Sequence, residues 1–132
     1  MRILNPAEWI KPKGYANGIL AEGSHVHVAG QIGWNAQAEF ETDDFGEQAR
    51  QAMLNIARVL AEGGARPEHV TRMTWYVTDK REYLAAAEAI GKAYRDIFGR
   101  HYPAMTLVQV AALLEDRAKV EIEATAVIPP AK

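Results

Sequence analysis

The sequence predicts an α+β fold in which two helices cover one face of a mixed sheet. Three observations favour this fold class: alternating stretches typical of strands occur early and late in the chain, two amphipathic helical stretches lie between them, and another strand separates the two helices. The predicted order is β-β-α-β-α-β-β, with about five strands. A length of 132 residues suits one hydrophobic core, so we expect a single domain over residues 1–132.

The first 62 residues contain a loop-rich segment, a strand and a helix. Proline and glycine punctuate the first 24 residues, which favours loops with one short strand. Polar and apolar residues alternate from His25 to Gly30, as in a strand that ends at a glycine turn. Asp44, with Glu47 three residues later, predicts the start of a helix that ends at Gly63. Its apolar positions recur at helical spacing: Phe45, Ala49, Ala52, Met53, Ile56 and Leu60.

A strand and a second helix follow. In the strand from Val70 to Thr78, alternation places Met73, Trp75 and Val77 on one face and Arg72, Thr74 and Tyr76 on the other. Asp79, with Glu82 three residues later, predicts the start of one continuous helix that ends at Gly99. Its apolar stripe is Tyr83, Ala87, Ile90, Tyr94 and Ile97.

The last two predicted strands span Met105 to Leu113 and Lys119 to Ile128. In the final strand Val120, Ile122, Ala124, Ala126 and Ile128 share one face, and Lys119, Glu121, Glu123 and Thr125 share the other. Two carboxylates suit a dry core poorly, so the second face is expected to border a cleft or a subunit interface. Since two helices cover only one face of a sheet, we expect another copy of the chain to cover the other face.

Composition excludes several classes of function. The formal net charge is −2 and basic residues are scattered, which disfavours a nucleic-acid partner. The chain has no cysteine, so disulfides and thiolate chemistry are excluded. No apolar run approaches the roughly 18–20 residues of a membrane span, and the first residues lack the apolar segment of a secretory signal. A cytoplasmic location without a membrane partner is the expectation.

Five short motifs, in order, resemble the signature of the Rid family, also called YjgF or L-PSP. They are Gly14-Tyr-Ala-Asn-Gly18, Ala29-Gly-Gln-Ile32, Asn55, Tyr102-Pro-Ala104 and Val120-Glu-Ile-Glu-Ala124. The resemblance implies a chorismate-mutase-like fold and a homotrimer with three small-molecule clefts between its subunits. Typical members hydrolyse reactive enamines and imines released by pyridoxal-phosphate enzymes, giving a keto acid and ammonia. They use no metal and no bound cofactor, so none is expected here.

The resemblance assigns roles to three residues. Tyr15 would orient a water or a substrate nitrogen, the Gly30 backbone would approach the ligand closely, and Glu121 would relay a proton to or from the attacking water. Each residue also has a structural alternative. Tyr15 would pack on the core, Gly30 would end a strand, and Glu121 would pair with a basic residue of a neighbouring chain.

Three positions depart from the family pattern. Met105 follows Pro-Ala where typical imine deaminases carry an arginine that clamps the substrate carboxylate with two parallel hydrogen bonds. Gly91 stands where an asparagine is usual, and Ala29 lacks a hydroxyl that is typical of its position. We predict that Gly91, Met105 and the adjacent Thr106 contact a ligand different from the usual one.

Four further residues are candidates near that ligand. Trp34 is predicted to roof the cleft, with a core or interface position as the alternative, and Arg100 and His101 to supply positive charge, with exposed loop positions as the alternative. Asn55 is expected to bond a nearby loop. His25 and His27 share a strand face, but no further ligand at suitable spacing supports a metal site.

Two functional hypotheses remain, with a weaker third. The first is hydrolytic deamination of a reactive imine or enamine, or of a related small substrate other than the usual 2-imino acids. The second is a non-catalytic trimer that binds a metabolite for sensing or sequestration. The third is the endoribonuclease or translation-inhibitor activity of some relatives, which the acidic balance and the scattered basic residues disfavour.

Overall fold

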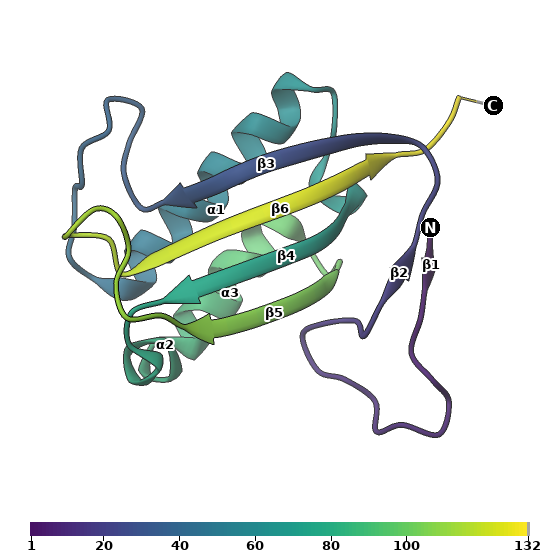
Figure 1. Cartoon of the computed structure of the whole chain (residues 1–132), viewed down its shortest axis with the longest axis horizontal. Helices are drawn as coiled ribbons and strands as arrows, with labels where there is room; N and C mark the ends of the chain where they lie inside the picture. The colour runs from purple at the N-terminus through teal and green to yellow at the C-terminus, as the bar shows by residue number, and fades with distance from the viewer. Residues whose placement is uncertain (132) are drawn as a thin grey trace.

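A four-stranded mixed sheet, covered by helices on one face only, forms the body of the protein (Figure 1). The computed structural model describes residues 1–131. The strands lie in the order β3-β6-β4-β5, with β6 antiparallel to both of its neighbours and β5 parallel to β4. Their bounds are β3 Ser24–Ile32, β4 Val70–Val77, β5 Ala104–Gln109 and β6 Val120–Ile128.

Helix α1 (Phe45–Glu62) begins and ends where the sequence predicts. The Asp44 carboxylate accepts a hydrogen bond from the Glu47 amide at 2.9 Å, and the Gly63 amide donates to the Leu60 carbonyl. The apolar stripe of α1 is buried against the sheet. Among residues 1–131, no helix is long and apolar enough to cross a membrane.

The second predicted helix is divided in two, so the prediction of one continuous helix was wrong. The chain forms α2 (Lys80–Ala85) and α3 (Ala87–Phe98), which meet at the non-helical Ala86. The apolar pattern misses this break because a single non-helical residue hardly shifts the stripe: Tyr83, before the break, still packs against the core that contains Ile90. A short 3₁₀ helix, η1 (Pro67–His69), precedes β4.

The N-terminal segment also differs from prediction. It has two short strands, β1 (Arg2–Ile3) and β2 (Ile19–Leu20), which pair with each other in a separate sheet, so the main sheet has four strands and not five. The segment between them projects to one side of the body (Figure 1). Its end returns to the main sheet, where the Ala16 amide donates to the Pro103 carbonyl at 3.0 Å.

Strand β5 is shorter than predicted. It ends at Gln109, opposite Val77, and not at Leu113. The neighbouring strand β4 ends at Val77, so pairing stops there: the Val110 amide still donates to the Val77 carbonyl at 2.8 Å, but β4 does not continue beside the residues that follow. The composition of residues 110–113 suits a strand, but only the length of the neighbour decides where pairing stops.

The two faces of the sheet have the predicted characters. On the helix-covered face, Val120 and Ile122 are fully buried, together with Met73 and Trp75 of β4. The opposite face, here called the open face, carries polar side chains of β4 and β6. On it the Tyr76 hydroxyl donates to the Glu123 carboxylate at 2.6 Å. This bond raises the Tyr76 pKa, since ionising the phenol would place two negative charges together.

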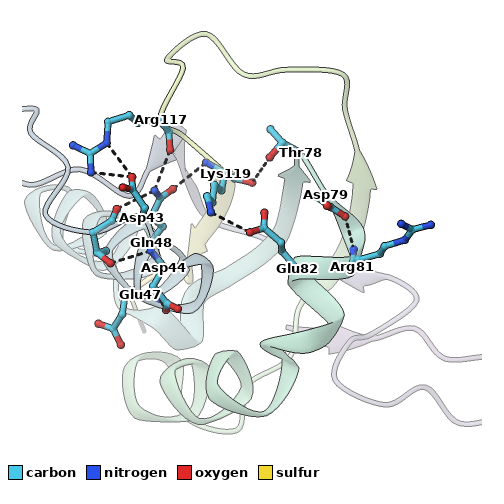
Figure 2. A network of polar contacts seen from close by, with 11 residues as sticks. Asp43, Asp44, Glu47, Gln48, Thr78, Asp79, Arg81, Glu82, Arg117 and Lys119 are labelled. Atoms are coloured by element: carbon cyan, nitrogen blue, oxygen red, sulfur yellow. Dashed lines mark hydrogen bonds and ion pairs between the residues drawn. The ribbon is translucent and has the colours of Figure 1, made fainter.

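Buried Gln48 of α1 holds the beginning of β6 in place (Figure 2). Its amide nitrogen donates to the carbonyls of Thr42 and Arg117, and its amide oxygen accepts from the Lys119 amide at 2.9 Å. Helix α1 approaches closely here, because a Cβ at Gly33 would lie 2.6 Å from the Gln48 Cβ. These contacts fix the segment that leads into Glu121.

The Gln48→Ala variant should lose about 3 kcal/mol of unfolding free energy, because two carbonyls and one amide would stay buried without partners. Urea unfolding at matched protein concentration measures the loss. Gln51→Ala, one turn later, is the control: its amide donates to Asn55 only, so its cost should stay below about 1 kcal/mol. Equal losses in the two variants would contradict the role given to Gln48.

Candidate functional site

Met105 and Gly91, two of the positions that depart from the family pattern, line the same pocket. This helix-side pocket lies between β4, β5 and α3 and has a volume of about 200 Å³. That is below the range of about 300–1,000 Å³ typical of drug-sized ligands, so it suits a small molecule or one end of a larger one. Gly14, from the loop that carries Tyr15, also borders it.

Four aromatic side chains, Trp75, Tyr83, Tyr94 and Tyr102, form part of the pocket wall. Tyr94 stacks on Tyr102 with ring centroids 5.3 Å apart, and its hydroxyl donates to the His101 carbonyl. Trp75 meets Tyr83 edge to face at 6.1 Å. Burial raises the pKa of Tyr94 and of Tyr83, so both phenols are neutral at physiological pH.

Two polar groups at this pocket were not anticipated from the sequence. Trp75 is 2% exposed, and its indole nitrogen is buried without a hydrogen-bond partner among residues 1–131. Arg95 lies one helical turn after Gly91, and its guanidinium nitrogen is 3.3 Å from where a Gly91 Cβ would be. The four-residue spacing on one helix face was the only signal in the sequence for Arg95.

Glu121 and Gly30 come together on the open face. A Cβ at Gly30 would lie 2.5 Å from a carboxylate oxygen of Glu121, so the absence of a side chain at Gly30 makes room for that carboxylate. Glu121 lies opposite Ile32 of β3 and Tyr76 of β4. It is partly exposed, whereas its neighbours Val120 and Ile122 point into the core.

The open face also bears a shallow polar cavity of about 550 Å³. Thr106 lines this cavity and not the helix-side pocket, because successive strand residues point to opposite faces. Thr106 and Met105 of one chain therefore cannot contact one small ligand together. His27 also lines the cavity, next to His25 with ring centroids 6.1 Å apart. Residues 1–131 contain no cluster of three or more side chains suited to a metal ion.

The remaining candidates lie around these two regions. Tyr15 is exposed, and the next residue, Ala16, bridges to Ala104 directly before Met105. Trp34 packs against Phe40 at 5.9 Å in the loop after β3.

The three remaining candidates, Asn55, Arg100 and His101, differ in their hydrogen bonds and exposure. The Asn55 amide donates to the carbonyls of Ile32 and Trp34, which confirms that it bonds a nearby loop. Arg100 is exposed in the turn after α3. A ring nitrogen of His101 bonds the Val70 carbonyl, so this nitrogen is already occupied within the chain.

One chain therefore holds two separate groups of candidate residues. Gly91 and Met105 lie on the helix-covered side of the sheet, and Gly30 and Glu121 lie on the open face. The four-stranded sheet separates them. A site that used both groups would need residues from two chains.

The sheet is covered on one face, and two acidic residues, Glu121 and Glu123, lie on the opposite face of its inner strand β6. This arrangement defines a class of small α+β proteins. The family model described as Endoribonuclease L-PSP matches residues 10–128. The chain belongs to the Rid family, which is also called YjgF or L-PSP.

Several relatives are similar over nearly their whole length. A RutC family protein of Pyrococcus abyssi is 32% identical over 88% of each chain. A 2-iminobutanoate/2-iminopropanoate deaminase of Capra hircus is 30% identical over 88% of this chain and 81% of its own. The Rid family protein YyfB of Yersinia pestis has a TM-score of 0.84 and 31% identity, covering 96% of this chain and 98% of that one. Escherichia coli TdcF, solved with bound serine, has a TM-score of 0.68 and 34% identity over 91% of each chain.

The Tyr94→Phe variant tests the buried phenol. Because the pKa of Tyr94 is raised in the folded state, its contribution to stability is complete below the unfolded pKa of about 10 and is lost at higher pH. At neutral pH, Tyr94→Phe should lose about 1 kcal/mol with the hydrogen bond to His101. This difference from the wild type should shrink above about pH 10. Urea unfolding measures it, and a difference that stays constant into the alkaline range would contradict the assignment.

Proposed function

We propose that this protein hydrolyses a reactive imine or enamine, or a related small substrate, in clefts between the subunits of a homotrimer. One observation carries the proposal: the Glu121 carboxylate lies directly against Gly30, on the face of the sheet opposite the helices (Figure 1). A carboxylate next to exposed backbone is suited to hold a water and to exchange a proton with it. The relatives named as imino-acid deaminases support the same class of reaction.

The proposed reaction consumes one water and releases ammonia. Glu121 accepts a proton from the water while the water oxygen forms a bond to the imine carbon, and Glu121 passes that proton to the imine nitrogen, which gives a neutral carbinolamine. Glu121 then takes the hydroxyl proton of the carbinolamine and delivers it to the nitrogen as the C–N bond breaks. Ammonia leaves with the electron pair of that bond, a carbonyl remains, and the carboxylate is regenerated. Tyr15 would orient the water or the nitrogen.

The substrate should differ from the usual 2-imino acids. A carboxylate beside the Met105 thioether would lack the arginine partner that the family pattern places at that position, so it would need a charged partner from another position to offset its loss of hydration. The small Gly91 and the aromatic wall leave room for a larger and less polar group. Substrate class is thus the point on which this protein would diverge from its named relatives.

The positions of the two residue groups support an assembly of several copies, for which we propose a trimer. Glu121 of one chain and Met105 of the same chain lie on opposite sides of the sheet, so a shared cleft needs a second copy. Covering the open face would also remove exposed apolar surface, for example at Val108, from water.

A metabolite-binding role without catalysis is the second candidate. It is favoured by the relative TdcF, whose structure holds bound serine, a small metabolite that is not an imine. In that case the pockets would bind a ligand but would not accelerate its hydrolysis.

An ammonia-release assay separates these functions. An amino-acid oxidase generates 2-iminopropanoate or 2-iminoglutarate, and ammonia is followed with and without the protein. The wild type should accelerate hydrolysis of these usual substrates little, and Met105→Arg should increase it, because the guanidinium would supply the missing carboxylate partner.

Variants of the carboxylate region test the mechanism with a substrate that the wild type does hydrolyse. Glu121→Ala should reduce the rate by about 100-fold or more, as expected for loss of a general base. Gly30→Ala should also reduce it, because its Cβ would displace the carboxylate, while thermal stability changes little since only a flexible side-chain end must move. Strong wild-type activity that survives in Glu121→Ala would rule out this mechanism.

Light scattering tests the assembly. At micromolar concentration the protein should have three times its monomer mass of 14.6 kDa. A monomer under these conditions would refute the trimer and, with it, a cleft that combines Glu121 with Met105.

A further inference from the structure

The helix-side pocket holds a positive charge that has no carboxylate partner. The guanidinium of Arg95 borders the pocket, and among residues 1–131 no carboxylate lies within 4.0 Å of it. Arg50 of α1 and Lys92 of α3 do have such a partner, since both pair with Asp96, the residue next to Arg95. The charge of Arg95 is therefore available to a ligand.

Gly91 permits this position of Arg95. Side chains on an α-helix lean toward its N-terminus, so a residue covers the turn that precedes it. Arg95 accordingly lies over Gly91, with a guanidinium nitrogen 3.3 Å from where a Cβ would be. A Cβ at Gly91 would require the guanidinium to shift by a few tenths of an ångström, and a larger side chain such as asparagine would compete with it for the same space.

A second polar group, on a residue that lines the same pocket, also lacks a partner. The Trp75 indole N–H is buried and without a hydrogen bond among residues 1–131, which costs about 1–3 kcal/mol unless something else accepts the bond. Buried indole N–H groups usually do have an acceptor. Since Trp75 lines the helix-side pocket, a ligand there can supply one.

We infer that Arg95 binds the carboxylate of a small organic acid whose flat apolar body fills the helix-side pocket and whose second acceptor atom receives the Trp75 indole N–H. The aromatic wall and Met105 suit a planar or aryl group, and a guanidinium holds a carboxylate through two parallel bonds. Positive charge thus comes from helix α3 and not from position 105 of strand β5. The binding of the acid by Arg95 is independent of the proposed function. Only the further step, that this acid is also the substrate, rests on the proposed function.

Binding is tested with stable probes, 3-phenylpropanoate and its neutral amide, by isothermal titration calorimetry on the full-length protein. The wild type should bind the carboxylate at least tenfold more tightly than the amide, which corresponds to about 1.4 kcal/mol. Arg95→Gln should remove this preference, and Gly91→Asn should weaken carboxylate binding through displacement of the guanidinium. Arg58→Gln, which removes an exposed arginine of α1 paired with Glu62, should leave binding unchanged.

The indole signals in a ¹H–¹⁵N spectrum report on Trp75 directly. The chain has three tryptophans, and Trp9→Phe and Trp34→Phe identify the Trp75 signal by elimination. Phenylpyruvate, which adds a keto oxygen as a second acceptor, should shift the Trp75 signal more than 3-phenylpropanoate does. Failure of both acids to bind at millimolar concentration, or equal binding by wild type and Arg95→Gln, would overturn the inference.

Ammonia release separates this inference from the proposed function. With the imine of phenylalanine as substrate, Arg95→Gln should raise KM more than it lowers kcat, because Arg95 binds the ligand at a distance from the proposed proton relay. Arg95-dependent binding without ammonia release would retain the inference and refute the deaminase. Ammonia release that does not change in Arg95→Gln would retain the deaminase and refute the inference.

Discussion

The position of β6 between β3 and β4, with helices on only one of its faces, is the constraint on which the rest of the structure depends. It buries Val120 and Ile122 under the helices and leaves Glu121 and Glu123 on the open face. Gln48 holds the beginning of this strand through two partly buried hydrogen bonds, to the Arg117 carbonyl and from the Lys119 amide. A carboxylate on a sheet face is tolerated only next to water, a partner or a ligand, so the same strand both completes the core and presents the candidate proton relay.

Separation of the two residue groups by the sheet has a chemical consequence. The acidic group and the helix-side pocket cannot interfere with each other within one chain, so no ion pair between Glu121 and Arg95 neutralises either group. Each charge stays free for a ligand or a second subunit. The arginine on α3 also changes the direction from which a carboxylate would be held, compared with the arginine that the family pattern places on β5. In the proposed ligand site, Gly91 would leave room for Arg95, and Met105 would make part of the pocket wall apolar.

Much of the fold was predictable because local physical rules agree with the tertiary contacts. The Asp44 cap, the buried face of β4 and the Asn55 contact with a nearby loop follow from capping, alternation and the chemistry of an amide in mid-helix. The break at Ala86 and the end of β5 at Gln109 were not predicted. The break depends on the backbone dihedral angles of Ala86 alone, and the end of β5 depends on where the neighbouring strand stops. In the candidate site, Arg95 escaped notice because an arginine on an exposed helix face is ordinary until a pocket is seen beside it.

By itself the sequence determined the family and the residues that share each strand face, because motifs and periodicity are local properties of the chain. Only the tertiary structure decided which residues share a site. It placed Met105 with Gly91, Arg95 and Trp75, placed Thr106 on the other face, and set Glu121 against Gly30. Those groupings depend on which strands become neighbours and which helix packs over them. Such contacts join residues far apart in the chain, and no local pattern encodes them.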